Sequence, residues 1–148
     1  MAQEPAHESE TVATNIATGV PVVGMLDLLK LYTPDVGQAV AFYRDVLGAV
    51  VAEEDLPHWA RVRLANVDIG LHLGEPAGQG PGAGWEPTFR VQDIAAFRAH
   101  LQAGGVPLLR DLHDIPGGVI LAFAGPDGTA LSVSQYGTSV QALTGDAG

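Results

Sequence analysis

The order of expected secondary structure occurs twice along this chain of 148 residues. Residues 28 to 35 line up with residues 86 to 93 at a constant offset, so that a strand end and a helix cap coincide in both halves. In each half, one strand is followed by a helix and then by three more strands. The sequence therefore predicts an α+β fold built from two βαβββ units.

The first half begins with a strand over residues 25 to 33, and helical spacing of apolar residues follows over residues 34 to 48. Thr33 or Asp35 can cap the start of that helix, and Gly48 can end it. The three remaining strands of this unit are expected at residues 50 to 54, 58 to 65 and 68 to 74.

In the second half, a strand over residues 85 to 92 leads to a helix that Asp93 caps and Gly104 ends. Its later strands are expected at residues 106 to 110, 118 to 124 and 129 to 136. The stretch LHDIPGG (112 to 118) contains His113 and Asp114, but its proline and glycines predict a surface loop rather than a catalytic pair.

The chain is long enough for one hydrophobic core, which sets the expected domain organisation. We expect a mobile tail over residues 1 to 21, a single domain over residues 22 to 137, and a C-terminal tail over residues 138 to 148. Within the domain, the units cover residues 22 to 74 and 85 to 137, and a Gly/Pro-rich linker at 75 to 84 joins them.

Charge and composition exclude several classes of partner. Seventeen acidic and seven basic residues give a formal net charge of −10, which disfavours nucleic acid and anionic membrane surfaces. We see no apolar run of the ~20 residues that span a bilayer and no signal peptide. The sequence contains no cysteine, so we expect a cytoplasmic location and no thiolate metal site.

Four short motifs carry a resemblance to a known family. They are FYRDVLG (42 to 48), FRVQDI (89 to 94), AGGVP (103 to 107) and GPDGTAL (125 to 131). Together with the repeat, they resemble the vicinal oxygen chelate (VOC) superfamily, which includes glyoxalase I, bleomycin-resistance proteins, extradiol dioxygenases and fosfomycin-resistance enzymes. The resemblance covers about residues 25 to 137. It implies eight strands curled around a cleft, with the helices on the outside, and a homodimer.

Alternation along the strands then assigns side chains to the cleft. The residues expected to contact a ligand are Leu28, Lys30, Tyr32, Trp59, Arg61, Arg63, Gly70, His72, Glu86, Thr88, Arg90, Ser132 and Ser134. For Arg61 and Arg63 an alternative is slightly favoured, namely ion pairs with nearby acids such as Asp68 on a solvated sheet face. Trp59 could stack on a planar ligand or pack against a partner subunit.

In metal-using relatives, one His, Gln or Glu ligand comes from each of four strands. The corresponding positions here are Leu28, Gly70, Glu86 and Ser132, and only Glu86 is a good ligand for a divalent ion. His72 also faces the cleft, although it lies two residues beyond the expected position on its strand. His72 and Glu86 are therefore the candidate metal ligands. We expect no metal cofactor. Glu86 is also the best candidate for an acid or base, the alternative being a solvated carboxylate.

Two functions of different class follow from the resemblance. The first is a small-molecule-binding protein of the glyoxalase/bleomycin-resistance type, without the usual metal, that sequesters a small ligand; the basic cleft residues favour an anionic one. The alternative is a metal-dependent lyase or dioxygenase of the glyoxalase type that uses Glu86 and His72. The sequence leaves open whether the cleft lies within one chain or between two.

Overall fold

The computed structural model describes residues 17–126 and 128–145. Most of the segment expected as an N-terminal tail lies outside the described residues. The described elements are β1 (Leu26–Thr33), α2 (Val36–Asp45), β2 (Val50–Asp55), β3 (Trp59–Arg63), β4 (Asp68–Leu73), β5 (Trp85–Arg90), α3 (Ile94–Ala103), β6 (Leu108–Ile115), β7 (Gly118–Ala124), β8 (Ala130–Tyr136) and α4 (Val140–Thr144).

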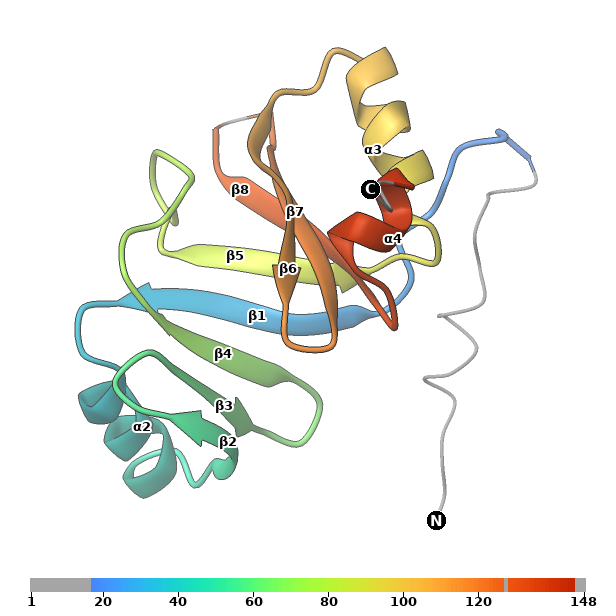
Figure 1. The fold of residues 1–148 in the computed structure, drawn as a ribbon. Helices are drawn as coiled ribbons and strands as arrows, with labels where there is room; N and C mark the ends of the chain where they lie inside the picture. Colours follow the sequence, from blue (N-terminus) through green and yellow to red (C-terminus); the bar gives the residue numbers. More distant parts are fainter. Residues whose placement is uncertain (1–16, 127, 146–148) are drawn as a thin grey trace.

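The strands form one eight-stranded sheet in the order β2-β3-β4-β1-β5-β8-β7-β6. β1 and β5 pair antiparallel at its centre, and β1 pairs parallel with β4 just as β5 pairs parallel with β8. Figure 1 shows β1 and β5 crossing the middle of the molecule, with the later strands of each unit on opposite sides. The predicted pair of βαβββ units is confirmed, and both units belong to one sheet of one chain.

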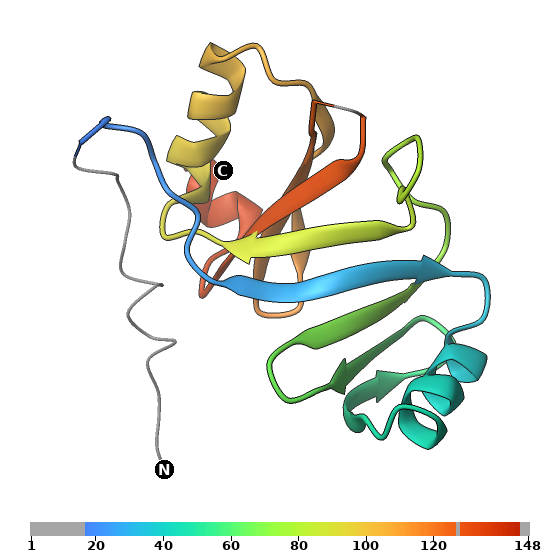
Figure 2. The ribbon, with the colours of Figure 1, turned by 180° about the vertical axis from the view of Figure 1, so that it is seen from behind.

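Both long helices begin at an aspartate cap. Asp35 accepts a hydrogen bond from Gln38 N at 2.9 Å, and Asp93 accepts one from Ala96 N at 3.0 Å. Each cap satisfies one of the free N–H groups of the first helical turn. In both views of the molecule α2 and α3 lie at opposite ends, each beside the strands of its own unit (Figures 1 and 2).

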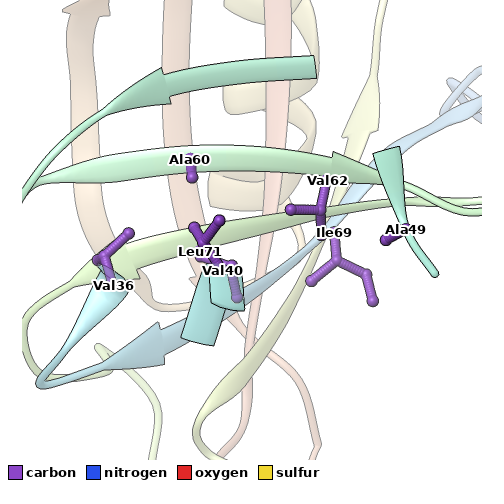
Figure 3. Close-up of a cluster of buried hydrophobic side chains, with 7 residues drawn as sticks. All are labelled: Val36, Val40, Ala49, Ala60, Val62, Ile69 and Leu71. Carbon is purple, nitrogen blue, oxygen red and sulfur yellow. The ribbon is translucent and has the colours of Figure 1, made fainter. Parts of the chain in front are cut away.

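Each unit packs its helix on its strands through a separate apolar cluster. Figure 3 shows the first cluster, in which α2 contributes Val36 and Val40, β3 contributes Val62, and β4 contributes Ile69 and Leu71. The second cluster joins Ile94, Phe97 and Leu101 of α3 to Val119, Leu121 and Val133. Complete burial of a side chain such as Leu71 contributes about 1.5–3 kcal/mol, so these clusters hold the helices on the outer face of the sheet.

β6 differs from the prediction. The strand expected at 106 to 110 is present, but it begins at Leu108 and continues to Ile115, so residues 112 to 115 are strand and not loop. The turn expected within residues 112 to 118 occupies Pro116 and Gly117. Gly117 has a φ of 81°, which suits a tight turn. Pairing with the apolar strand β7 outweighs the local loop signal. His113 therefore lies on a strand.

The segment expected as a C-terminal tail contains the short helix α4. Val140 N donates a hydrogen bond to Asp114 Oδ1 at 2.9 Å, and Val140 and Leu143 pack against the second cluster. These contacts fix α4 against β6. None of the helices in the described ranges combines the length and the apolar character that crossing a bilayer requires.

Candidate functional site

A cavity of about 660 Å³ opens on the inner face of the curled sheet. Its walls come from β1, β2, β3, β4, β5, β6, β7 and β8, so both units of one chain build it. The lining residues are Asp27, Leu28, Lys30, Tyr32, Glu53, Glu54, Asp55, His58, Trp59, Arg61, His72, Leu73, Thr88, Arg110, His113, Ile115, Pro116, Ile120, Ser134 and Tyr136. The volume lies in the range of cavities that bind small molecules.

The residues that the sequence assigned to the cleft divide into two groups. Leu28, Lys30, Tyr32, Trp59, Arg61, His72, Thr88 and Ser134 line the cavity. Arg63, Gly70, Glu86, Arg90 and Ser132 are not among its lining residues. Arg63 forms the ion pair that the sequence analysis favoured over a ligand contact: its side chain is exposed, and its Nε donates to Asp68 Oδ1 at 2.8 Å.

Three rings form one wall of the cavity. The His72 ring lies 5.1 Å from the ring of Tyr32 and 6.0 Å from that of Trp59, measured between centroids. Trp59 Nε1 donates to Glu53 Oε1 at 3.1 Å, and His72 Nδ1 lies 2.7 Å from Leu73 O. A carbonyl only accepts, so Nδ1 carries the proton and Nε2 accepts in the neutral ring. Burial lowers the pKa of His72 and keeps this ring neutral at pH 7.

Gly70 has a steric role in this wall. A β-carbon at position 70 would lie 2.9 Å from Trp59 Cζ3 and 3.1 Å from Leu28 Cδ1. The absence of a side chain therefore lets the Trp59 indole lie directly against β4. The indole covers Gly70, which explains why this predicted ligand contact is not exposed to the cavity.

Lys30 and Glu86 form a buried ion pair beneath the cavity. Lys30 Nζ lies 3.4 Å from Glu86 Oε2, and the Glu86 side chain is 1% exposed. Glu86 Oε1 has no hydrogen-bond partner among the described residues. Lys30 is a lining residue of the cavity, whereas Glu86, the carboxylate predicted as an acid or base, is not. Glu86 is instead paired with the Lys30 ammonium.

Asp27 is a site residue that the sequence reasoning missed. Its side chain, 2% exposed, accepts hydrogen bonds from Arg61 Nη2 at 3.2 Å and from Arg90 Nε at 3.2 Å, and Tyr136 Oη donates to its Oδ2 at 2.8 Å. Strict alternation places Asp27 on the outer face. A β-bulge breaks that alternation, because Leu26 pairs with Phe89 while Leu28 pairs with Thr88.

The same network alters Tyr136. Burial and the Asp27 carboxylate raise the pKa of the Tyr136 hydroxyl to about 12, so this group stays protonated and donates to Asp27. Arg61 also donates to Asp68 Oδ2 at 2.6 Å. The charges of Arg61 and Arg90 are thus directed at protein carboxylates.

Arg110 is the second missed residue. It lies on β6, the strand whose length the sequence underestimated, and its Nη1 donates to Tyr32 Oη at 2.6 Å. Its guanidinium carbon also lies 5.5 Å from the centroid of the Tyr32 ring. Burial and Glu86 raise the pKa of the Tyr32 hydroxyl, and the bond from Arg110 opposes that rise. Arg110 thereby connects the second unit to β1.

The residues at the four positions that correspond to metal ligands do not fit a divalent ion. Leu28 and Gly70 have no donor atom, and the Ser132 hydroxyl is hydrogen-bonded to the Thr88 hydroxyl at 2.7 Å. Glu86 already pairs with Lys30. Across residues 17–126 and 128–145, no group of three or more His, Cys, Asp or Glu side chains is placed to hold a metal. One carboxylate beside an ammonium is a poor donor set for Zn²⁺ or Mn²⁺.

Comparisons with known proteins agree with the fold. A family model described as "Glyoxalase/Bleomycin resistance protein/Dioxygenase superfamily" matches residues 25–133. No curated protein sequence matches the chain.

Solved structures give the same architecture. A member of that superfamily from Vibrio splendidus 12B01 is 22% identical, with a TM-score of 0.59, over 73% of this chain and 96% of its own. Methylmalonyl-CoA epimerase from Mycobacterium tuberculosis is 18% identical, with a TM-score of 0.61, over 78% of this chain and 90% of its own. A variant of homoprotocatechuate 2,3-dioxygenase from B. fuscum is 22% identical, with a TM-score of 0.60, over 90% of this chain and 37% of its own. At these identities the similarity shows the fold.

Proposed function

The chain belongs to the Glyoxalase/Bleomycin resistance protein/Dioxygenase superfamily, and from that premise we propose that it binds a small organic molecule in its cavity without a divalent metal. One observation carries the proposal. The cavity of about 660 Å³ has the size and the mixed apolar and polar walls of a small-molecule site, while the residues beneath it pair with one another instead of leaving converging donors for an ion.

The lining supports a ligand with both apolar and polar parts. Leu28, Ile120 and the Trp59 indole supply apolar surface. Ser134 is a lining residue of the cavity, and its buried hydroxyl has no hydrogen-bond partner within the described part of the chain. A buried hydroxyl without a partner costs about 1–3 kcal/mol, so a polar group of a ligand at this position gains that interaction.

A metal-dependent lyase or dioxygenase is the other function that the family allows. It needs His72 and Glu86 as ligands of one ion. Glu86 is 1% exposed and its Oε2 pairs with the Lys30 ammonium, while the Nδ1 atom of His72 lies against Leu73 O. The unpartnered atoms are Nε2 of His72 and Oε1 of the buried Glu86, which are too few donors for a divalent ion. The geometry favours the binding protein.

Metal analysis separates these two functions. Protein purified without chelator is expected to contain less than about a tenth of an equivalent of Zn, Ni, Mn or Fe, and EDTA should leave the thermal midpoint unchanged, because an ion that binds only the folded state raises its stability. A stoichiometric metal that is lost in Glu86→Ala would overturn the metal-free proposal.

A fragment screen tests the binding itself. Trp59 fluorescence is read in a Trp85→Phe background, because Trp85 packs against the first apolar cluster rather than in the cavity. Compounds that change the emission are then tested by ligand-observed NMR, which an added tryptophan does not disturb, and should no longer bind Ile120→Trp, where a larger side chain fills the cavity. If every hit acts equally on Ile120→Trp, as judged on a variant with an unchanged circular dichroism spectrum, the cavity is not the binding site.

The expected homodimer belongs to the same proposal. Phe42, Val46 and Leu47 of the α2 region and Val50 at the start of β2 are exposed apolar residues close in sequence, and such a surface suits a second copy of the chain. Light scattering should give twice the monomer mass, and Val46→Asp should return the monomer. The cytoplasmic location also remains a prediction.

A further inference from the structure

The basic side chains that line the cavity differ in how many protein carboxylates they are paired with. Lys30, Arg61 and Arg110 line it. Arg61 forms ion pairs with Asp27 at 3.2 Å and with Asp68 at 2.6 Å, so two protein carboxylates already hold its guanidinium. A ligand anion would have to compete with both of them. The charge available to a ligand must come from Lys30 or Arg110.

Arg110 forms no ion pair with any carboxylate among the described residues. Its two hydrogen bonds run to neutral oxygens, Tyr32 Oη at 2.6 Å and Glu75 O at 3.4 Å, and the second is long. Neither bond uses Nε, and both leave the net positive charge of the half-buried guanidinium uncompensated. A planar guanidinium in this state binds a planar carboxylate through two parallel hydrogen bonds.

Lys30 adds a second cation beside the same ring. Its Nζ lies 5.9 Å from the centroid of Tyr32, and the guanidinium carbon of Arg110 lies 5.5 Å from that centroid. Glu86 binds Lys30 through one long contact of 3.4 Å, and an ammonium has two further protons to donate. The Tyr32 hydroxyl accepts from Arg110 at 2.6 Å, and burial and the nearby Glu86 carboxylate raise its pKa, so it stays protonated.

Three acids of β2 also line the cavity and oppose an anion. Glu53, Glu54 and Asp55 are exposed, whereas Lys30 is buried and Arg110 is half-buried. The fourth acid of the lining, Asp27, is buried and already paired with Arg61 and Arg90. Water and salt weaken the field of exposed charges, while a cation at lower effective dielectric attracts an anion several times more strongly at the same distance. The inner end of the cavity therefore favours an anion.

The rings next to these cations limit the shape of the ligand. Tyr32, His72 and Trp59 lie side by side near Lys30 and Arg110, with the His72 ring tilted by 48° to Tyr32 and by 76° to Trp59. A flat conjugated body can therefore stack on one of these rings while its charged end reaches the guanidinium. We infer that the cavity binds a planar carboxylate, aromatic or conjugated, whose carboxylate is held by Arg110 and Lys30 at Tyr32. This inference rests on the proposed function and names the ligand class of the same site.

Three probes of one size and different charge test the ligand class. Benzoate, benzamide and benzylamine are titrated into labelled protein, and side-chain nitrogen signals of arginine and lysine are followed by NMR. Benzoate should bind about tenfold more tightly than benzamide, as expected for a charge-assisted bidentate contact, and should shift Arg110 Nε and Lys30 Nζ. Equal binding of benzoate and benzamide, or tighter binding of benzylamine, overturns the inference.

Variants assign the preference to the two cations. Arg110→Gln should abolish the preference for benzoate, and Arg110→Lys, which keeps the charge without the fork, should restore only part of it. Arg63→Gln is the matched control, because Arg63 is exposed and lies outside the cavity lining. Since Lys30 cannot be removed without leaving Glu86 buried alone, it is tested as Lys30→Met/Glu86→Leu, which should lower the preference severalfold.

The outcomes distinguish this inference from the proposed function. If Arg110→Gln keeps the full preference for benzoate, the carboxylate binds elsewhere and the inference fails. If no probe binds at millimolar concentration, the inference also fails, since the wall and cations described should retain benzoate. In either case the proposed function, binding of a small molecule in the cavity, is tested separately by whether Ile120→Trp abolishes the binding of the fragment hits.

Discussion

Asp27 of the first unit holds Arg90 of the second, because Asp27 Oδ1 accepts from Arg90 Nε at 3.2 Å across the central strand pair. The same carboxylate accepts from Arg61 on β3 and from Tyr136 at the end of β8. One buried side chain thus connects β1, β3, β5 and β8. Asp27 lines the cavity, and its carboxylate is already hydrogen-bonded to Arg61, Arg90 and Tyr136.

Asp27→Ala should destabilise the fold strongly. The change leaves Arg61 and Arg90 without their shared carboxylate in a buried place, and removal of one member of a buried charge network costs about 3–5 kcal/mol. Urea unfolding followed by circular dichroism measures this difference. Asp45→Ala is the control, since the Arg44–Asp45 pair is exposed on both sides and its loss should change stability little. Equal effects of the two variants would contradict the role assigned to Asp27.

Gly70→Ala should move Trp59 without unfolding the protein. The added methyl group meets the far end of the indole, 2.9 Å from Cζ3, and a side chain of this kind can turn away where backbone could not. The movement breaks the hydrogen bond from Trp59 Nε1 to Glu53 and turns the indole toward the cavity.

The emission spectrum of Trp59, recorded in a Trp85→Phe background, reports this movement. Gly84→Ala serves as the control, because a β-carbon there would meet only Leu31 Cδ1 at 3.6 Å, an ordinary contact. An unchanged Trp59 spectrum in Gly70→Ala would show that Gly70 does not determine the position of the indole.

The order of strands and helices along the chain, both helix caps and the repeat could be predicted from the sequence because each is a local signal that tertiary structure does not oppose. Asp35 and Asp93 cap their helices through bonds to the backbone three residues later, and such bonds depend on local sequence. Alternation along β1 likewise placed Lys30 and Tyr32 at the cavity.

The parts that the sequence did not predict depend on partners far away in the chain. A one-residue bulge against β5 turns Asp27 inward, and nothing around Asp27 marks the bulge. Arg110 reaches Tyr32, 78 residues away in the sequence, because the two units share one sheet that brings β6 opposite β1. Residues 108 to 113 read LLRDLH and do not alternate between apolar and polar, so local sequence gives little sign of the longer strand.

Glu86→Ala should lower stability at neutral pH, because Lys30 then remains buried without its carboxylate. The expected loss is about 3–5 kcal/mol. The double variant Lys30→Met/Glu86→Leu should recover most of it, since apolar side chains of similar volume replace a buried pair at little or no cost. Free energies of unfolding of the wild type, Lys30→Met, Glu86→Leu and the double variant give the coupling energy of the pair. A double variant that is less stable than Glu86→Ala would indicate that the pair is a net source of stability.

His72 should make the protein less stable in mild acid. Burial lowers its pKa in the folded protein below the usual 6.5. Between the folded and the unfolded pKa, the unfolded chain binds the proton more readily than the folded chain, so the free energy of unfolding decreases as the pH falls below about 6.5.

His72→Gln keeps a polar side chain and removes the titration. The variant should therefore lose less stability than the wild type between neutral pH and about pH 5, measured by urea unfolding at each pH. Parallel curves for the two proteins would show that His72 titrates as it does in the unfolded chain, and an NMR titration of its Cε1 proton would give the pKa independently.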